Sequence, residues 1–137
     1  PAYQDKVQSS GMRQMPDVSF DADQSTGVPV FDSVPYFGQT GWFVVGGTSF
    51  GAPSWSAILA DADQLRAAGA KPPLTAAGFA AQKAVYSLPD SVLAPVTTGP
   101  ANGFCPDGCV PGPGYDEITG LGSPRAGIDA ALAAAAG

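Results

Sequence analysis

The segment from Trp42 to Ala68 constrains the fold of this chain more than any other. Trp42–Val45 is a run of four apolar residues, which predicts a strand buried on both faces. After Gly46 and Gly47 the apolar residues recur every three and four positions, which predicts a helix over about Gly51–Ala68. Ser49 therefore stands where an extended strand turns into a helix.

The predicted helix carries its charges unevenly. Its first half is apolar on almost every face, because Phe50, Ala57 and Ala60 fill the positions outside the main apolar stripe. Charged residues appear only from Asp61 onward, and Gly69 ends the helix. We therefore expect the helix to enter the core with its N-terminal half and to leave it with its C-terminal half.

The rest of the chain divides into shorter elements. Alternation over 18–22 predicts a half-buried strand, and a turn at 25–27 would join it in a hairpin to a second strand at 28–31. Helices are expected at about 75–86 and 124–136, the second capped by Ser123, and they flank a Gly- and Pro-rich loop region at about 87–122. Five aromatic residues are expected in the core: Trp42, Phe43, Trp55, Phe79 and Tyr86. Tyr36 and Phe37 have two possible roles, which are to line a substrate cleft or to pack within their loop, and the sequence does not decide between them.

Composition excludes several classes of function. The chain has 137 residues, enough for one domain or a piece of one, and because it starts at Pro1 we expect a processed chain or part of a longer one. Six basic residues against twelve acidic ones, a net charge of −6, argue against nucleic-acid binding. The absence of histidine removes the usual general base and the commonest transition-metal ligand. No stretch approaches the roughly 20 apolar residues of a membrane span.

Cys105 and Cys109 are the only cysteines, and Pro-Asp-Gly separates them. They can close a small disulfide loop or remain two free thiols. The pair argues against a zinc site, because two thiolates without histidine or another cysteine fall short of four ligands. A disulfide would indicate an exported protein, secreted or in the cell envelope.

Ser49 has two interpretations. A serine at a strand-to-helix junction lies beside unpaired helical N–H groups and the positive end of the helix dipole, both of which stabilise the negative charge of an acyl-transfer reaction. The alternative is that Ser49 only caps the helix, as serine often does.

Three segments resemble one known family. Gly46–Pro53, Gly-Gly-Thr-Ser-Phe-Gly-Ala-Pro, resembles the nucleophile segment of the subtilisin clan. Pro16–Asp23, Pro-Asp-Val-Ser-Phe-Asp-Ala-Asp, followed by Thr26-Gly27, resembles the Pro-Asp-Val-Ser region of sedolisins, the serine-carboxyl peptidases. Gly112–Pro124, Gly-Pro-Gly-Tyr-Asp-Glu-Ile-Thr-Gly-Leu-Gly-Ser-Pro, resembles the sedolisin C-terminal calcium segment. The segments follow the family order, and the resemblance runs from about 14 to 129.

The resemblance implies a subtilisin-like, three-layer α/β fold with a mostly parallel sheet, of which residues 1–137 form the C-terminal part of the catalytic domain. It implies that Ser49 is the nucleophile of a serine-type endopeptidase and that its N–H is an oxyanion donor. The glutamate and aspartates that activate the serine match no position here. Upstream sequence or a companion chain would supply them, and this chain alone is expected to be inactive on its polypeptide substrate. In the family, the segment with Asp17, Asp21 and Asp23 is structural.

The resemblance also implies a calcium site. Gly112 and Gly114 match carbonyl donors, Asp116 matches the carboxylate, and Val96 would add a carbonyl. Pro95 stands where the family has its first aspartate ligand, so one strong ligand is missing. The alternative to calcium is a Gly-Pro loop that Asp116 holds by accepting hydrogen bonds from backbone N–H groups.

Two other functions stay open. The chain can be a catalytically inactive relative that serves as a binding or scaffold module, or a true subtilisin with an upstream histidine, against which the 112–124 segment argues. A glutamate base fits the lack of histidine, because a carboxylate with a pKa near ~4.3 still accepts a proton in acid. The resemblance therefore predicts activity at low pH.

Overall fold

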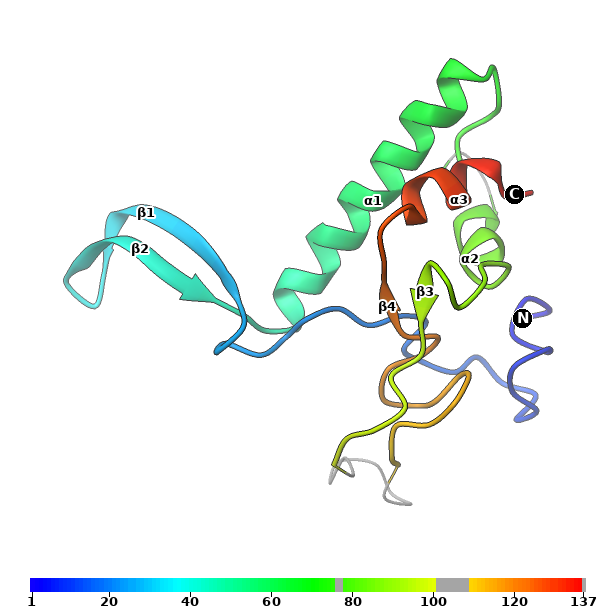
Figure 1. Ribbon diagram of the computed structural model, residues 1–137, viewed down its shortest axis with the longest axis horizontal. Coiled ribbons are helices and arrows are strands. Elements are labelled where there is room, and N and C mark those ends of the chain that lie inside the picture. Colours follow the sequence, from blue (N-terminus) through cyan, green and yellow to red (C-terminus); the bar gives the residue numbers. More distant parts are fainter. Residues whose placement is uncertain (76–77, 101–108, 137) are drawn as a thin grey trace.

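The computed structural model describes residues 1–75, 78–100 and 109–136. Within them the chain forms seven elements in the order β1 (Val28–Tyr36), β2 (Gln39–Val45), α1 (Thr48–Ala68), α2 (Ala80–Val85), β3 (Leu93–Ala94), β4 (Ser123–Pro124) and α3 (Ile128–Ala134). Figure 1 shows two unequal parts: a β1–β2 hairpin extends from the N-terminal end of α1, and the other elements gather beside the rest of that helix.

The core lies where the C-terminal half of α1 meets α2 and α3 (Figure 1). Its buried apolar side chains are Ala62, Leu74, Ala84, Val85, Leu93, Ile128 and Leu132. Arg66 is buried among them at 5 % exposure, and its guanidinium donates to the carbonyls of Pro72 (2.7 Å) and Ala135 (2.8 Å). Because a buried charge is costly without partners, these bonds tie the end of α1 to the loop after it and to the end of α3.

The hairpin differs from the predicted one. The strand predicted at 18–22 is wrong, because β1 pairs antiparallel with β2 and residues 18–22 join no ladder. Phe37 (φ 48°) and Gly38 (φ 77°) form the two-residue turn, and positive φ at both positions matches the turn type that follows the twist of a hairpin. The alternation at 18–22 has another cause: Phe20 packs on Phe50 of α1, with ring centroids 5.3 Å apart.

The predicted mostly parallel sheet is absent from the described residues, where both two-stranded sheets, β1–β2 and β3–β4, are antiparallel. A two-residue connection such as that between β1 and β2 permits only antiparallel pairing. The strand predicted at Trp42–Val45 is confirmed as part of β2, but its burial on both faces is wrong, since Trp42 is 71 % exposed and Val44 62 %.

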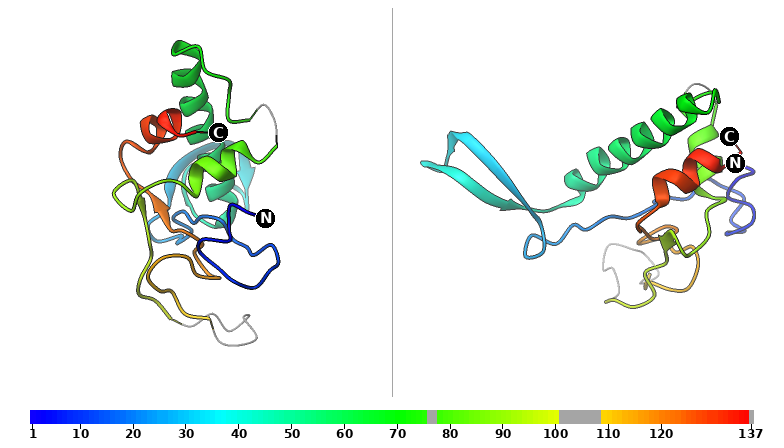
Figure 2. Two further views of the ribbon diagram at one scale, coloured as in Figure 1. Left: turned by 90° about the vertical axis from the view of Figure 1, so that its right-hand side faces the viewer. Right: turned by 45° about the horizontal axis from the view of Figure 1, so that its top comes forward.

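The long helix is confirmed, and it begins at Thr48, three residues earlier than predicted. Its predicted orientation is wrong. The buried residues of α1 are Ala62 and Arg66, both in the C-terminal half, and no residue of 48–61 is buried. The cause is that α3 packs on the C-terminal half, whereas the hairpin extends away from the N-terminal end (Figure 2).

The remaining helices are shorter than predicted. Helix α2 spans Ala80–Val85 of the expected 75–86, and α3 begins at Ile128 because Ser123 and Pro124 form β4. Ser123 therefore caps no helix, and its hydroxyl lies 2.9 Å from that of Ser19.

The expected aromatic core is wrong for Trp42 and Phe79, which are exposed. Trp55 is half-buried and packs against the core, and Phe43 and Tyr86 are half-buried. No helix in the part of the chain that the structure describes is long and apolar enough to cross a membrane.

Candidate active site

Ser49 is the second residue of α1, and its side chain is exposed. The residue that caps the helix is Gly47, and no side chain forms a cap hydrogen bond there. The capping interpretation of Ser49 is therefore wrong. Because Ser49 lies in the first turn, its N–H has no acceptor one turn earlier in the helix. An accessible hydroxyl and an unpaired N–H thus lie side by side at the positive end of the helix dipole.

Two glycines make this junction possible. A Cβ on Gly46 would lie 2.7 Å from the carbonyl oxygen of Asp23, so only glycine lets the 23–24 turn approach β2 this closely. Gly47 has φ 115°, which L-residues with a side chain rarely adopt. The chain therefore passes from the end of β2 into α1 within two residues and presents Ser49 at its surface.

A largely apolar hollow adjoins the first turns of α1. Residues of segment 16–22, the start of α1 and Ile118–Thr119 line it, and the helix contributes Thr48, Gly51, Ala52 and Trp55. The Trp55 indole donates to the carbonyl of Ser19 at 3.0 Å and fixes segment 16–22 beside the helix.

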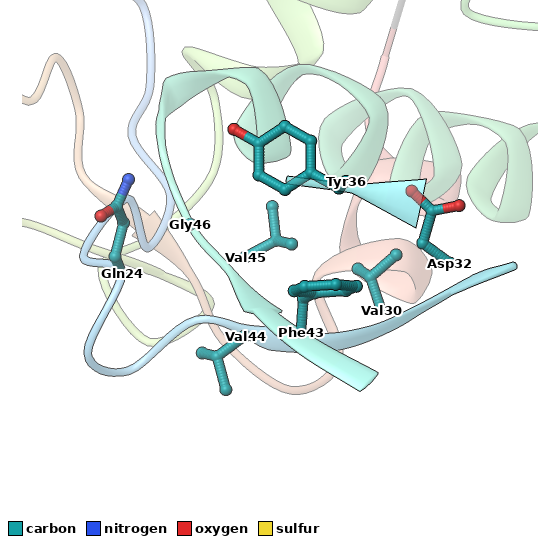
Figure 3. Close-up of a pocket in the computed structure, with 8 residues that line it drawn as sticks. All are labelled: Gln24, Val30, Asp32, Tyr36, Phe43, Val44, Val45 and Gly46. Carbon is teal, nitrogen blue, oxygen red and sulfur yellow. The ribbon is translucent and has the colours of Figure 1, made fainter. Parts of the chain in front are cut away.

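A second hollow lies on the hairpin just before Ser49 (Figure 3). Val30, Phe43 and Tyr36 form its apolar wall, with the Asp32 carboxylate at one side and Gln24 at the other. The rings of Tyr36 and Phe43 meet edge to face with centroids 6.1 Å apart. Tyr36 therefore lines a hollow, whereas Phe37 is 90 % exposed at the turn.

The aspartates of segment 16–23 are engaged locally. Asp17 accepts from the Tyr86 hydroxyl at 2.7 Å and forms an ion pair with Arg13. Asp21 accepts from the Asp23 N–H at 3.0 Å. The backbone N–H of Ser25 donates to Asp23 and is the main cause that lowers the pKa of that carboxyl. Their contacts are those of structural carboxylates, and among the described residues Ser49 hydrogen-bonds to none of them.

Sequence reasoning missed a buried polar contact at the N-terminus. Gln4 is fully buried, and its amide donates to Tyr86 (2.7 Å) and to the carbonyl of Gln14 (2.9 Å). Burial raises the pKa of the Tyr86 hydroxyl, against the opposing effect of the bond from Gln4. Residues 1–15 are polar and mixed, so nothing in the pattern distinguishes this glutamine from the exposed residues around it.

Asp116 organises the loop predicted to hold calcium. Its Oδ1 accepts the N–H groups of Ile118 (2.8 Å) and Thr119 (2.7 Å), and its Oδ2 accepts the Thr119 hydroxyl (2.8 Å) and the N–H of Gly112 (3.2 Å). A carboxylate offers about four acceptor positions, and these four donors fill them. Burial raises the pKa of Asp116, but the bonds from Thr119, Ile118 and Gly112 outweigh burial and lower it.

The donor set of this loop is weaker than the one that the resemblance implies. A calcium ion would compete for the Asp116 oxygens with four hydrogen-bond donors, and Pro95 offers no side-chain oxygen. The described residues contain no group of three or more His, Cys, Asp or Glu that could hold a metal. Val96, Gly112 and Gly114 could contribute only carbonyl oxygens, whose charge is too small to replace two carboxylates. The disulfide considered between Cys105 and Cys109 involves Cys105, which lies outside the described residues.

Comparison with known proteins identifies the family. No family model matches the chain. Xanthomonalisin from Xanthomonas sp. (strain T-22) is 36 % identical over 125 residues, which cover 90 % of this chain and 13 % of xanthomonalisin. A solved Pseudomonas sedolisin, a serine-carboxyl proteinase complexed with two molecules of pseudo-iodotyrostatin, matches 98 % of this chain with a TM-score of 0.66 and 33 % identity. The chain belongs to the sedolisin family.

The match with sedolisin extends to the fold. Because nearly the whole chain superimposes on 33 % of the Pseudomonas sedolisin chain, the arrangement in Figure 1 is that of part of a subtilisin-like α/β fold. The chain spans about an eighth of the length of xanthomonalisin and a third of that of the solved sedolisin. Only a part of each sedolisin relative is therefore represented here.

Proposed function

We propose that Ser49 is the nucleophile of a serine-carboxyl peptidase of the sedolisin type, which hydrolyses peptide bonds in acid. The observation that carries this proposal is the position of Ser49: an exposed hydroxyl in the first turn of α1, directly after Gly46 and Gly47, in a chain 36 % identical to xanthomonalisin. The hydroxyl attacks the scissile carbonyl, and the Ser49 N–H donates to the oxyanion that forms.

The proposed reaction needs a base that this chain does not bring to Ser49. A serine hydroxyl is a weak nucleophile until an adjacent group accepts its proton. Asp17, Asp21 and Asp23 are engaged elsewhere, so a glutamate and aspartates from another polypeptide segment would complete the site. This chain alone is accordingly inactive, and the complete site works in acid because a carboxylate base keeps its accepting ability there.

We also propose that hydrogen bonds to Asp116 hold the 112–120 loop in place of calcium. The four donors to the carboxylate support this. A secreted or cell-envelope location and a Cys105–Cys109 disulfide fit a peptidase of this type, and they belong to the same proposal.

The test is the peptidase activity of the complete protein with Ser49→Ala. The proposal expects activity in acid that this substitution abolishes. Activity that survives the substitution would exclude Ser49 as the nucleophile. An activity that rises through neutral pH would favour a histidine base, and a complete protein without activity would be the inactive binding module.

A further inference from the structure

Ser19 bonds to two parts of the chain that lie far from it in the sequence. Its N–H donates to the carbonyl of Gly122 at 2.9 Å, and its hydroxyl lies 2.9 Å from that of Ser123 in β4. Its carbonyl accepts the indole N–H of Trp55 at 3.0 Å. In Figure 1 this part of the chain passes beside both the start of α1 and β4. The polar groups of Ser19 therefore join the end of the 112–122 loop to α1.

Segment 19–27, which begins with Ser19, contacts the chain on both sides of Ser49. After Ser49, Phe20 packs on Phe50 with ring centroids 5.3 Å apart. Before Ser49, the backbone of the segment comes so close to Gly46 that an added Cβ would lie 2.7 Å from a carbonyl oxygen. The position of this segment therefore limits where the strand-to-helix junction can lie.

Hydrogen bonds, and not continuous packing, hold the start of this segment in place. A hollow lies between residues 16–22 and the first turns of α1, so packing there is incomplete. The carbonyl of Asp17 accepts the N–H of Leu121 at 2.8 Å, beside Gly120, where a Cβ would lie 2.3 Å from that carbonyl oxygen. The position of the segment therefore depends on the bonds that Asp17 and Ser19 form with residues 120–123.

We infer that Ser19 is a positioning residue of the proposed peptidase: it fixes the first turn of α1, and with it the hydroxyl and N–H of Ser49, relative to the loop that Asp116 closes. The inference rests on the proposed function and adds to it a residue that acts through Trp55 without touching the reacting atoms. A displacement of about 1 Å at a reacting group can cost about a hundredfold in rate. Loss of the Ser19 contacts should therefore lower kcat far more than it raises KM.

The test is a pair of substitutions in the complete protein, measured with a peptide substrate in acid. Trp55→Phe keeps an aromatic ring and removes the indole N–H, and Ser123→Ala removes the hydroxyl that meets Ser19. We expect each variant to lower kcat about fivefold or more and to leave KM within about twofold of its original value. Ser123→Thr keeps a hydroxyl and should keep most of kcat. An unchanged kcat in both Trp55→Phe and Ser123→Ala overturns the inference.

Ser87→Ala is the matched control. It also removes a hydroxyl that forms a hydrogen bond, to the carbonyl of Ala84 at 2.7 Å, but Ser87 follows α2 and lies outside segment 19–27 and α1. It should leave kcat unchanged, so equal losses in Ser87→Ala and Ser123→Ala would overturn the inference. The double variant Ser19→Ala with Ser123→Ala should lose no more kcat than either single variant, because the two hydroxyls form one bond. Additive losses would contradict the inference.

Hydrogen exchange separates this inference from the proposed function. The N–H of Phe50 donates to the carbonyl of Gly47 at 2.9 Å in the first turn of α1, so its exchange with D2O reports the order of that turn. Mass spectrometry of the complete Ser123→Ala protein should show faster deuterium uptake at 48–55 and unchanged uptake in α2. Unchanged uptake at 48–55 overturns the inference even in an active peptidase. Faster uptake in a protein without peptidase activity would keep Ser19 as the residue that orders this turn and overturn the proposed function.

Discussion

Thr119 donates to both oxygens of Asp116, through its backbone N–H to Oδ1 at 2.7 Å and through its hydroxyl to Oδ2 at 2.8 Å. With Ile118 and Gly112 as further donors, the carboxylate closes the loop that continues into β4. A carboxylate held in this way stabilises the conformation of the loop, as a bound cation can in other loops, since it fixes several backbone groups around one charge.

The first prediction concerns calcium. Because the donors to Asp116 already satisfy its oxygens, we expect neither added Ca²⁺ nor a chelator to change the thermal unfolding midpoint of the chain. Differential scanning calorimetry with and without each reagent measures this. A clear rise with Ca²⁺ that Asp116→Asn removes would establish a calcium site instead.

The second prediction concerns Asp116→Asn. The amide keeps one carbonyl oxygen but presents NH2 in place of the other acceptor, so at least one donor loses its partner. We expect a loss of about 1–3 kcal/mol in the free energy of unfolding near neutral pH. Urea titration measures it, and Asp90→Asn, at an exposed aspartate, is the control that should be nearly neutral.

The third prediction is the pH dependence of the same loop. The pKa of Asp116 is lowered below its ordinary 3.8, so the folded state favours the charged form. Its contribution is fully present above the unfolded pKa and is lost as the pH falls through the lower folded pKa. We expect stability to fall on acidification from about pH 4.

Urea titrations between about pH 5 and pH 2 would follow this loss. Asp116→Asn should make the fall less steep. Some fall should persist, because hydrogen bonds from Leu74 and Thr75 also lower the pKa of Asp63 against the opposing effect of burial. An unchanged slope in the Asn variant would show that Asp116 does not take part.

The fourth prediction tests Ser49 on the complete protein. Ser49→Ala should reduce kcat/KM for a peptide substrate in acid by about a thousandfold or more, with no loss of thermal stability, since the side chain is exposed. Ser56→Ala is the matched control: Ser56 is exposed on the same helix and bonds only to the carbonyl of Ala52. Similar losses in both variants would point to damage to the helix.

The fifth prediction compares two cations that share one acceptor. Arg66 and Lys71 both donate to the carbonyl of Ala133, Arg66 from a buried position and Lys71 from an exposed one. Arg66→Lys should lower the free energy of unfolding by about 2–3 kcal/mol, because an ammonium cannot reproduce the planar set of donors. Lys71→Ala should cost less than about 0.5 kcal/mol. Equal losses of unfolding free energy in urea titrations of the two variants would contradict the prediction that the buried cation contributes more than the exposed one.

The features that the sequence determined by itself were local secondary structure and membership of a family, which short motifs indicate. The apolar spacing after Gly46 predicted the long helix, and Gly46–Pro53 with the segments around Asp17 and Asp116 indicated the family. These features were accessible because helix periodicity and glycine placement depend on neighbours only a few residues away.

Only the tertiary structure decided which surfaces are covered. The apolar strand ending at Val45 and the apolar first half of α1 both predicted burial. The strand is largely exposed, the first half of α1 is at most half-buried, and the buried half of the helix is the one that carries Arg66. An apolar sequence predicts that a segment is covered, because contact between apolar side chains and water is unfavourable. Which other segment covers it depends on chain geometry, and for this hairpin the described residues supply none.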